Sequence, residues 1–161
     1  MANKTQQMQR LIRHYKEQTG KKEVDLHEVA KWAVDNGWPL PAPTNPLDLL
    51  AKEFARAARE EIRRDKQTGK PYRANHAITQ PQGNQQLTFW VDIDEAPRKI
   101  ILKSLNQRRE QMVGDGLQLT FDADHWNSIH PDEEPIVVQM DFTDDIEWRK
   151  NAPDDDEKKA S

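Results

Sequence analysis

The sequence predicts an α+β protein, and three observations predict it. Apolar residues recur at helical spacing in three successive stretches over residues 5–66. Apolar and polar residues then alternate over 72–79 and 87–93, two stretches separated by a polar turn. A further helical pattern follows Asp94, and no proline interrupts it before Pro131. We therefore expect three helices, a β-hairpin, a long helix, a short strand and an acidic disordered tail.

The first helix is expected at residues 5–18. Its apolar side chains lie at positions i, i+3, i+4 and i+7, as they do on one face of a helix. These residues are Met8, Leu11, Ile12 and Tyr15. Gly20 can end this helix, because glycine adopts the left-handed backbone of a C-terminal cap at no steric cost.

The second helix is expected to begin after Asp25. Asp25 and Glu28 have the spacing of a capping box, with aspartate in place of the usual serine or threonine. Asn36 and Gly37 can close the helix. The proline-rich stretch 38–43 that follows cannot be helical, so we expect an extended connection there.

The third helix is expected to run from residue 46 to residue 66 and to organise the rest of the chain. Asn45 can cap its start, and Pro46 suits the first turn, where a missing N–H costs nothing. An apolar stripe is expected to dock on a core: Leu47, Leu50, Phe54, Ala57 and Ile62. A second stripe, on a different face, is basic: Lys52, Arg56, Arg59, Arg63 and Lys66.

The hairpin is expected to place one histidine inside the protein and one tryptophan on the opposite side. His76 falls in the apolar register of the first strand, which favours a hydrogen-bonded core histidine. Trp90 falls on the strand face opposite Leu87 and Phe89. It is either covered by the last strand or the long helix, or exposed as an interface.

The long helix is expected to be capped by Asp94 and to continue to about Asn127. Gly114 and Gly116 each disfavour a helix interior by about 1 kcal/mol relative to alanine, but no proline ends the pattern. Alternation over residues 136–142 then predicts a last strand.

These elements divide the chain into four parts. We expect a domain over residues 5–93, a helical extension over 94–130, a C-terminal strand and short helix over 135–149, and a disordered acidic tail over 150–161.

Composition limits the class of protein. Hydrophobic residues make up 35% of the chain and charged residues 32%, with a mean hydropathy of −1.03, so the core is expected to be small. No run approaches the roughly 18 apolar residues that span a bilayer, and the first residues lack the apolar core of a signal peptide. We therefore expect a cytoplasmic protein with no membrane partner. The chain has no cysteine, which excludes disulfides, thiolate catalysis and cysteine zinc sites.

The net charge of −4 conceals a strong division. Residues 110–161 hold 15 acidic against 4 basic residues, and residues 1–109 hold 20 basic against 13 acidic residues. This division favours a body that binds a polyanion or docks a partner, followed by an acidic interaction tail. The alternative is a solvated surface whose halves merely balance.

No pattern for catalysis is present. Ser104 and Ser128 lie in no Gly-x-Ser-x-Gly elbow, and the chain has no glycine-rich phosphate loop. One acidic and histidine cluster could bind a metal, although a polar helix end explains it as well: Asp122, Asp124, His125 and His130. We predict no catalytic residue, no metal and no cofactor.

The order of elements resembles a known family. Helix, helix, longer helix, strand, polar loop and strand is the order of a winged helix, and the segment Lys22–Ala33 is similar to the second-helix region of small bacterial helix-turn-helix domains. This resemblance covers residues 5–93. The whole chain, including residues 107–111 and 141–145, also resembles a group of uncharacterised bacterial proteins.

The winged-helix resemblance implies binding to double-stranded DNA. In such domains the third helix enters the major groove and the wing touches the backbone or the minor groove. The basic residues expected at the DNA are Lys52, Arg56, Arg59, Arg63, Lys66, Lys70 and Arg73. The first expected function is therefore non-enzymatic, regulatory DNA binding through the 46–66 helix. The alternative is a protein-interaction module on a winged-helix scaffold, which binds itself through the long helix or joins a larger assembly.

Overall fold

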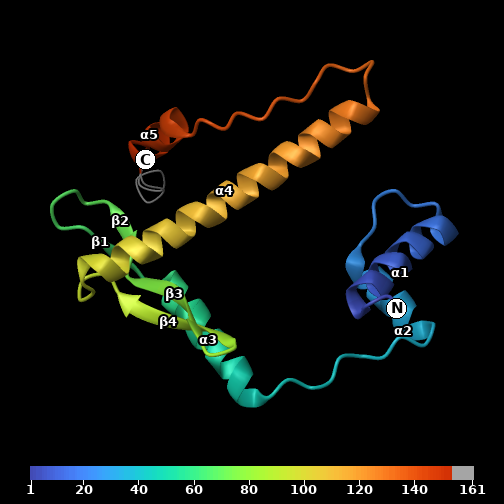
Figure 1. The fold of residues 1–161 in the computed structure, drawn as a ribbon, viewed down its shortest axis with the longest axis horizontal. Coiled ribbons are helices and arrows are strands. Elements are labelled where there is room, and N and C mark those ends of the chain that lie inside the picture. The colour runs from blue at the N-terminus through green and yellow to red at the C-terminus, as the bar shows by residue number, and fades with distance from the viewer. Residues whose placement is uncertain (154–161) are drawn as a thin grey trace. The chain divides into compact units, whose positions relative to one another are not determined.

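The computed structural model describes residues 1–153 and has a mixed α+β fold (Figure 1). The chain forms two compact units, which divide between Glu53 and Phe54. Within the described residues, no helix is both long and apolar enough to cross a membrane.

The first two helices form as the sequence predicts. Helix α1 (Lys4–Thr19) ends at Gly20, which has the left-handed φ of 71° that glycine adopts without strain. Helix α2 (Leu26–Asp35) begins after Asp25, whose carboxylate accepts the N–H of the second helical residue at 2.8 Å. Both helices, the stop at Gly20 and the cap at Asp25 are confirmed.

The core of the first unit lies where α1 meets α2. Tyr15 is buried, and its ring meets the ring of Trp32 edge to face, with 5.7 Å between centroids. Glu28 was expected to complete a capping box. Instead its carboxylate accepts hydrogen bonds from the Tyr15 hydroxyl at 3.3 Å and from the Lys21 ammonium at 3.1 Å. Glu28 therefore ties the two helices together.

Helix α3 (Pro46–Glu60) is shorter and less buried than the sequence predicts. Asn45 caps it, since its side chain accepts the Leu47 N–H at 3.0 Å. The apolar stripe does not dock on a core: Leu47, Leu50 and Phe54 are 73%, 47% and 68% exposed, and no residue of α3 is buried. The three-helix body of a winged helix therefore remains a prediction.

The prediction of a helix to residue 66 is wrong. Strand β1 (Ile62–Arg64) follows α3 and pairs antiparallel with strand β2 (Pro71–Arg73), with Ile62 opposite Arg73. The loop between these strands is set by Asp65, whose carboxylate accepts backbone N–H groups at 2.8 and 2.9 Å. The helical spacing of apolar and basic residues continues past the point where this strand pairing replaces the helix.

The predicted hairpin is confirmed. Strand β3 (Asn75–Gln82) pairs with strand β4 (Gln85–Asp92) across a two-residue turn, and Gly83 there has a φ of 62°. The alternation over residues 72–79 predicted one strand, but two strands, β2 and β3, form there and are separated by Ala74. The backbone of Ala74 bonds to residues next to β1 and next to β4. Its N–H donates to the Glu61 carbonyl at 3.1 Å, and its carbonyl accepts the Ile93 N–H at 2.9 Å.

Helix α4 (Arg98–Ile129) packs on the buried face of β3. His76 is 6% exposed and Ser104 is fully buried, with 3.0 Å between His76 Nδ1 and Ser104 Oγ. This confirms His76 as a hydrogen-bonded core histidine. The helix continues unbroken through both glycines, as predicted. Asp94 does not cap it, because the helix begins only at Arg98 and the Asp94 carboxylate is bound elsewhere.

The predicted strand at residues 136–142 is wrong. No strand forms in this part of the chain, because the backbone of Ile136 bonds to a side chain of α4 instead of to another strand. Asn127 accepts the Ile136 N–H at 2.8 Å and donates to the Ile136 carbonyl at 2.9 Å. The short helix α5 (Thr143–Lys150) follows, as expected. The predicted disordered tail lies, from residue 154 on, outside the described residues.

Candidate nucleic-acid interface

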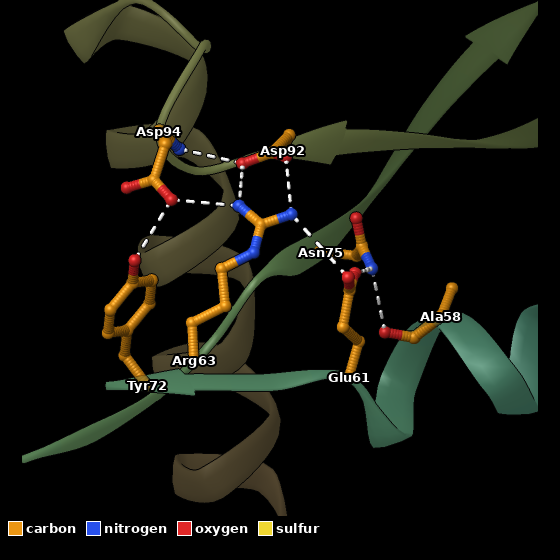
Figure 2. A network of polar contacts seen from close by, with 7 residues as sticks. All are labelled: Ala58, Glu61, Arg63, Tyr72, Asn75, Asp92 and Asp94. Carbon is orange, nitrogen blue, oxygen red and sulfur yellow. Dashed lines mark hydrogen bonds and ion pairs between the residues drawn. The ribbon is translucent and has the colours of Figure 1, made fainter. Parts of the chain in front are cut away.

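Arg63 is the centre of a polar network at the junction of α3, β1 and β4 (Figure 2). Its two terminal nitrogens bind both carboxylate oxygens of Asp92 at 2.8 Å each, and one of them also binds Asp94 at 2.8 Å. Glu61 lies 3.6 Å away, and the Arg63 side chain is only 34% exposed. A bidentate guanidinium–carboxylate pair is among the stronger polar contacts in proteins.

The network extends through neutral side chains. The Tyr72 hydroxyl donates to Asp94 at 2.9 Å, which raises the pKa of Tyr72. Asn75 donates to the Ala58 carbonyl at 3.1 Å and to Glu61 at 2.7 Å, so it ties the end of α3 to β3. The network therefore holds the end of α3 and both hairpins together.

The charge of Arg63 is neutralised inside this network. The Arg63 guanidinium, followed by the Asp94 N–H, holds the pKa of Asp92 below its usual value. The bonds to Asp92 and Asp94 raise the pKa of Arg63 itself. Arg63 was predicted to contact DNA, but its position indicates a structural role.

The other predicted basic residues are dispersed. Arg56 pairs with Glu60 one turn away, at 2.9 Å between Nε and Oε1. Lys70 donates to the carbonyl of Lys150 at 2.6 Å. Lys66 lies in the loop between β1 and β2, and Lys52 is exposed on α3. These four residues and Arg63 therefore lie on α3, on β1 and in the loop between β1 and β2, and not on one helix.

Two of the predicted residues do come together. Arg59 and Arg73, joined by Arg108 from α4, line a cavity of about 310 Å³ on the hairpin face that carries Trp90. We call this the arginine cavity. The guanidinium carbon of Arg59 lies 5.3 Å from the centre of the Trp90 ring, at cation–π distance. Trp90 is half-buried under this side chain, a cover that neither sequence alternative included.

The carboxylates near the arginine cavity are bound to other groups. Glu60 pairs with Arg56, and Glu61 with Arg63 and Asn75. Glu110 pairs with the neighbouring Arg109 at 3.7 Å. Across residues 1–153, no carboxylate forms an ion pair with Arg59, Arg73 or Arg108. The cavity therefore gathers three positive charges that the described chain does not neutralise.

A second hollow of about 650 Å³ adjoins the arginine cavity along α4. The two share Thr79, Gln107 and Gln111, and the second hollow is also lined by Lys99 and Lys103. Gln107 fixes the boundary, because it accepts the Thr79 N–H at 3.2 Å and donates to the Thr79 carbonyl at 3.0 Å. Basic side chains thus continue beyond the cavity on α4.

Sequence reasoning missed Arg108 because its neighbour Arg109 is equally basic. The burial of Ser104, one turn earlier on α4, shows that Arg108, and not Arg109, lies on the side of the helix that is next to the hairpin. The sequence does mark Trp90 as a candidate exposed aromatic, but it cannot pair that residue with Arg59.

The acidic and histidine cluster near the end of α4 forms no metal site. Asp122 accepts a hydrogen bond from Gln118 at 2.9 Å, and the His130 ring stacks on Trp126 with 4.0 Å between centroids. Among residues 1–153, no three histidine, aspartate or glutamate side chains are placed to hold a metal ion together.

Comparison with protein-family models, with curated proteins and with solved structures gave no match to this chain.

Proposed function

We propose that this chain is a non-enzymatic DNA-binding protein and that the arginine cavity is its contact surface. One observation carries the proposal: Arg59, Arg73 and Arg108 converge from three elements and have no carboxylate partner in residues 1–153. Bringing three like charges together disfavours folding unless an anion compensates for it. A phosphate backbone supplies such anions.

Arginine suits this role better than lysine does. Its planar guanidinium donates two parallel hydrogen bonds to a phosphate, which fixes the orientation of the ligand. Phosphate neutralisation also supplies most of the sequence-independent affinity for DNA. Lys99 and Lys103, in the adjoining hollow, extend the basic track along α4.

The proposal keeps part of the winged-helix resemblance and changes the contact element. Three helices come before the β3–β4 hairpin in the chain, with β1 and β2 between them. This order supports a winged-helix-like arrangement in which β3 and β4 are the wing. The contact surface is then the Trp90 face of that hairpin together with Arg59 and Arg108. It is not a continuous basic helix over residues 46–66.

The test is DNA binding by the full chain, measured by fluorescence anisotropy with labelled single-stranded and duplex oligonucleotides. We expect binding at about 50 mM salt that weakens steeply toward physiological salt. Arg59→Glu and Arg108→Glu are each expected to weaken binding about tenfold or more.

Arg56→Glu is the matched control. It makes the same charge change on the same helix, at a residue that is paired with Glu60 and lies outside the cavity. We expect it to weaken binding far less than Arg59→Glu does. The proposal fails if no oligonucleotide binds at about 50 mM salt, or if the Arg56 variant loses as much affinity as the cavity variants.

A second candidate function is self-association through α4, and the exposure of its apolar residues favours it. Seven large apolar side chains along this helix are between 46% and 57% exposed: Leu102, Leu105, Met112, Val113, Leu117, Leu119 and Phe121. A helix with that much exposed apolar surface is typical of one that packs against a partner.

The charges of α4 favour a second copy as that partner. Every lysine and arginine of the helix lies at or before position 109, and every aspartate and glutamate at or after position 110. Two antiparallel copies therefore place each basic half beside an acidic half, as a two-fold interface requires. Light scattering tests this candidate: we expect a dimer that dissociates in Leu105→Asp and Met112→Asp, and a monomeric wild type contradicts it.

A further inference from the structure

The arginine cavity contains an aromatic surface that is covered in part by a side chain that can move away. Trp90 is half-buried, and the Arg59 guanidinium lies over its ring at 5.3 Å. Arg59 is exposed and has no carboxylate to hold it there within residues 1–153. A rotamer change of Arg59 uncovers the indole, which then offers a flat apolar surface inside a basic cavity.

From this arrangement we infer that the site binds single-stranded DNA, with one unpaired base stacked on Trp90 and its phosphates held by Arg73 and Arg108. The inference rests on the proposed function and names its ligand. Arg59 then moves from the indole onto the base or the adjacent phosphate. Proteins usually bind single strands with aromatic rings that lie beside basic side chains, because every base has a face that can stack on an aromatic ring.

The shape of the site favours a single strand over a duplex. Its lining comes from α3, β2, β3, β4 and α4, and a volume of about 310 Å³ is recessed among them. The bases of a duplex are stacked on one another and cannot enter a recess, whereas an unpaired base can leave the strand and do so.

Two polar side chains of the cavity are free to meet the edge of a base. The side chains of Gln111 and Thr88 line the cavity and make no hydrogen bond within residues 1–153. By contrast, Gln107 and Asn75 are held by backbone groups. The cavity therefore combines a stacking surface, phosphate ligands and uncommitted hydrogen-bonding groups.

The composition of the hairpin turn also argues against binding to a duplex. Residues 80–86 contain no lysine or arginine, and their side chains are mostly amides. A wing that holds a duplex backbone needs cations to neutralise phosphates. The cations of this unit lie at the base of the hairpin, around Trp90, and not at its tip.

The experiment measures the affinity of the full wild-type chain for three probes of equal length at about 50 mM salt. They are a mixed-sequence single strand, the matching duplex, and a strand of abasic sites that keeps the phosphates and lacks the bases. We expect the single strand to bind about tenfold or more tightly than the other two, because only it can stack.

Variants then locate the stacking surface. Trp90→Ala is expected to lower affinity for the single strand to that for the abasic strand, while Trp90→Phe keeps most of the preference. Trp148→Ala, at an exposed tryptophan of α5, is the matched control and is expected to bind like wild type. The probe comparison needs no variant, so a folding defect at Trp90 does not block the test.

The outcomes separate this inference from the proposed function. If the duplex or the abasic strand binds wild type as tightly as the single strand does, base stacking is overturned, and loss of binding in Arg108→Glu still supports DNA contact. If the single strand is preferred but Trp90→Ala folds and keeps that preference, the assigned surface is overturned. If no probe binds, both the inference and the proposed function fail.

Discussion

Two arginine-rich regions of the same unit differ in what their charges meet. In the polar network, Arg63 contacts Asp92, Asp94 and Glu61 within 3.6 Å. In the arginine cavity, three guanidinium groups meet no carboxylate of residues 1–153. The first region holds elements of the protein together, and we propose that the second accepts an anion from outside.

The difference begins at the end of α3. Arg59 and Arg63 are four residues apart and would share one face of a continuous helix. Because α3 ends at Glu60, Arg63 lies on β1 and reaches the end of β4, whereas Arg59 stays on the helix and lies over Trp90. A change of secondary structure within four residues thus gives two arginines of one sequence stripe different surroundings.

The largest expected effect comes from removing the arginine of the network. Arg63→Ala leaves the carboxylates of Asp92, Asp94 and Glu61 close together without their shared cation, so we expect the melting temperature to fall by several degrees. Arg59→Ala and Arg108→Ala, at exposed positions of the cavity, are expected to change the free energy of unfolding by no more than about 1 kcal/mol. Thermal and urea unfolding followed by circular dichroism measure both.

Arg63→Lys sharpens this result. Lysine keeps the charge but cannot bind both oxygens of Asp92 at once, so we expect it to recover only part of the lost stability. Equal stability of the Arg63 and Arg59 alanine variants would show that the two regions contribute equally to the stability of the fold.

Much of the fold could be predicted from local sequence signals. The caps at Asn45 and Asp25, the stop at Gly20, the alternation around His76 and the uninterrupted pattern of α4 each depend on residues close in sequence. Such signals predict an element whenever local preference and tertiary contacts agree.

The two segments whose secondary structure was predicted wrongly share one cause, which is that a strand needs a partner. Residues 62–64 keep helical spacing but become β1 because β2 pairs with them. Residues 136–142 keep strand alternation but gain no strand partner, since Asn127 binds the backbone of Ile136. The candidate site depends on such contacts too, because Arg108, Trp90 and Arg59 lie on three different elements.

The pH dependence of stability provides a second, smaller difference between the polar network and the arginine cavity. Asp92 has a lowered pKa in the folded protein because Arg63 binds its ionised form, so its contribution to stability is present above its ordinary value of 3.8 and is lost as the pH falls below that value. We expect Asp92→Asn to destabilise the protein near neutral pH and to reduce the loss of stability below about pH 4.

The same substitution in an Arg63→Ala background is the control for the cause of this shift. Without the guanidinium, the pKa of Asp92 moves back toward its ordinary value, so Asp92→Asn should then change the pH profile of unfolding much less. An unchanged effect in that background would assign the pH dependence to the Asp94 N–H instead of to Arg63.

The smallest expected effect on stability comes from the contact between Arg59 and Trp90 in the arginine cavity. A double-mutant cycle of Arg59→Ala and Trp90→Leu isolates the cation–π coupling, which we expect to be about 0.5–1 kcal/mol, as at other exposed sites. The cycle of Arg56→Ala and Glu60→Ala, an exposed pair one turn apart on the same helix, is the comparison and should give about 0.3–0.5 kcal/mol. A coupling above about 2 kcal/mol between Arg59 and Trp90 would mean that the guanidinium is fixed on the indole. Arg59 would then belong with Arg63 among the structural arginines, and an incoming base could not displace it at low cost.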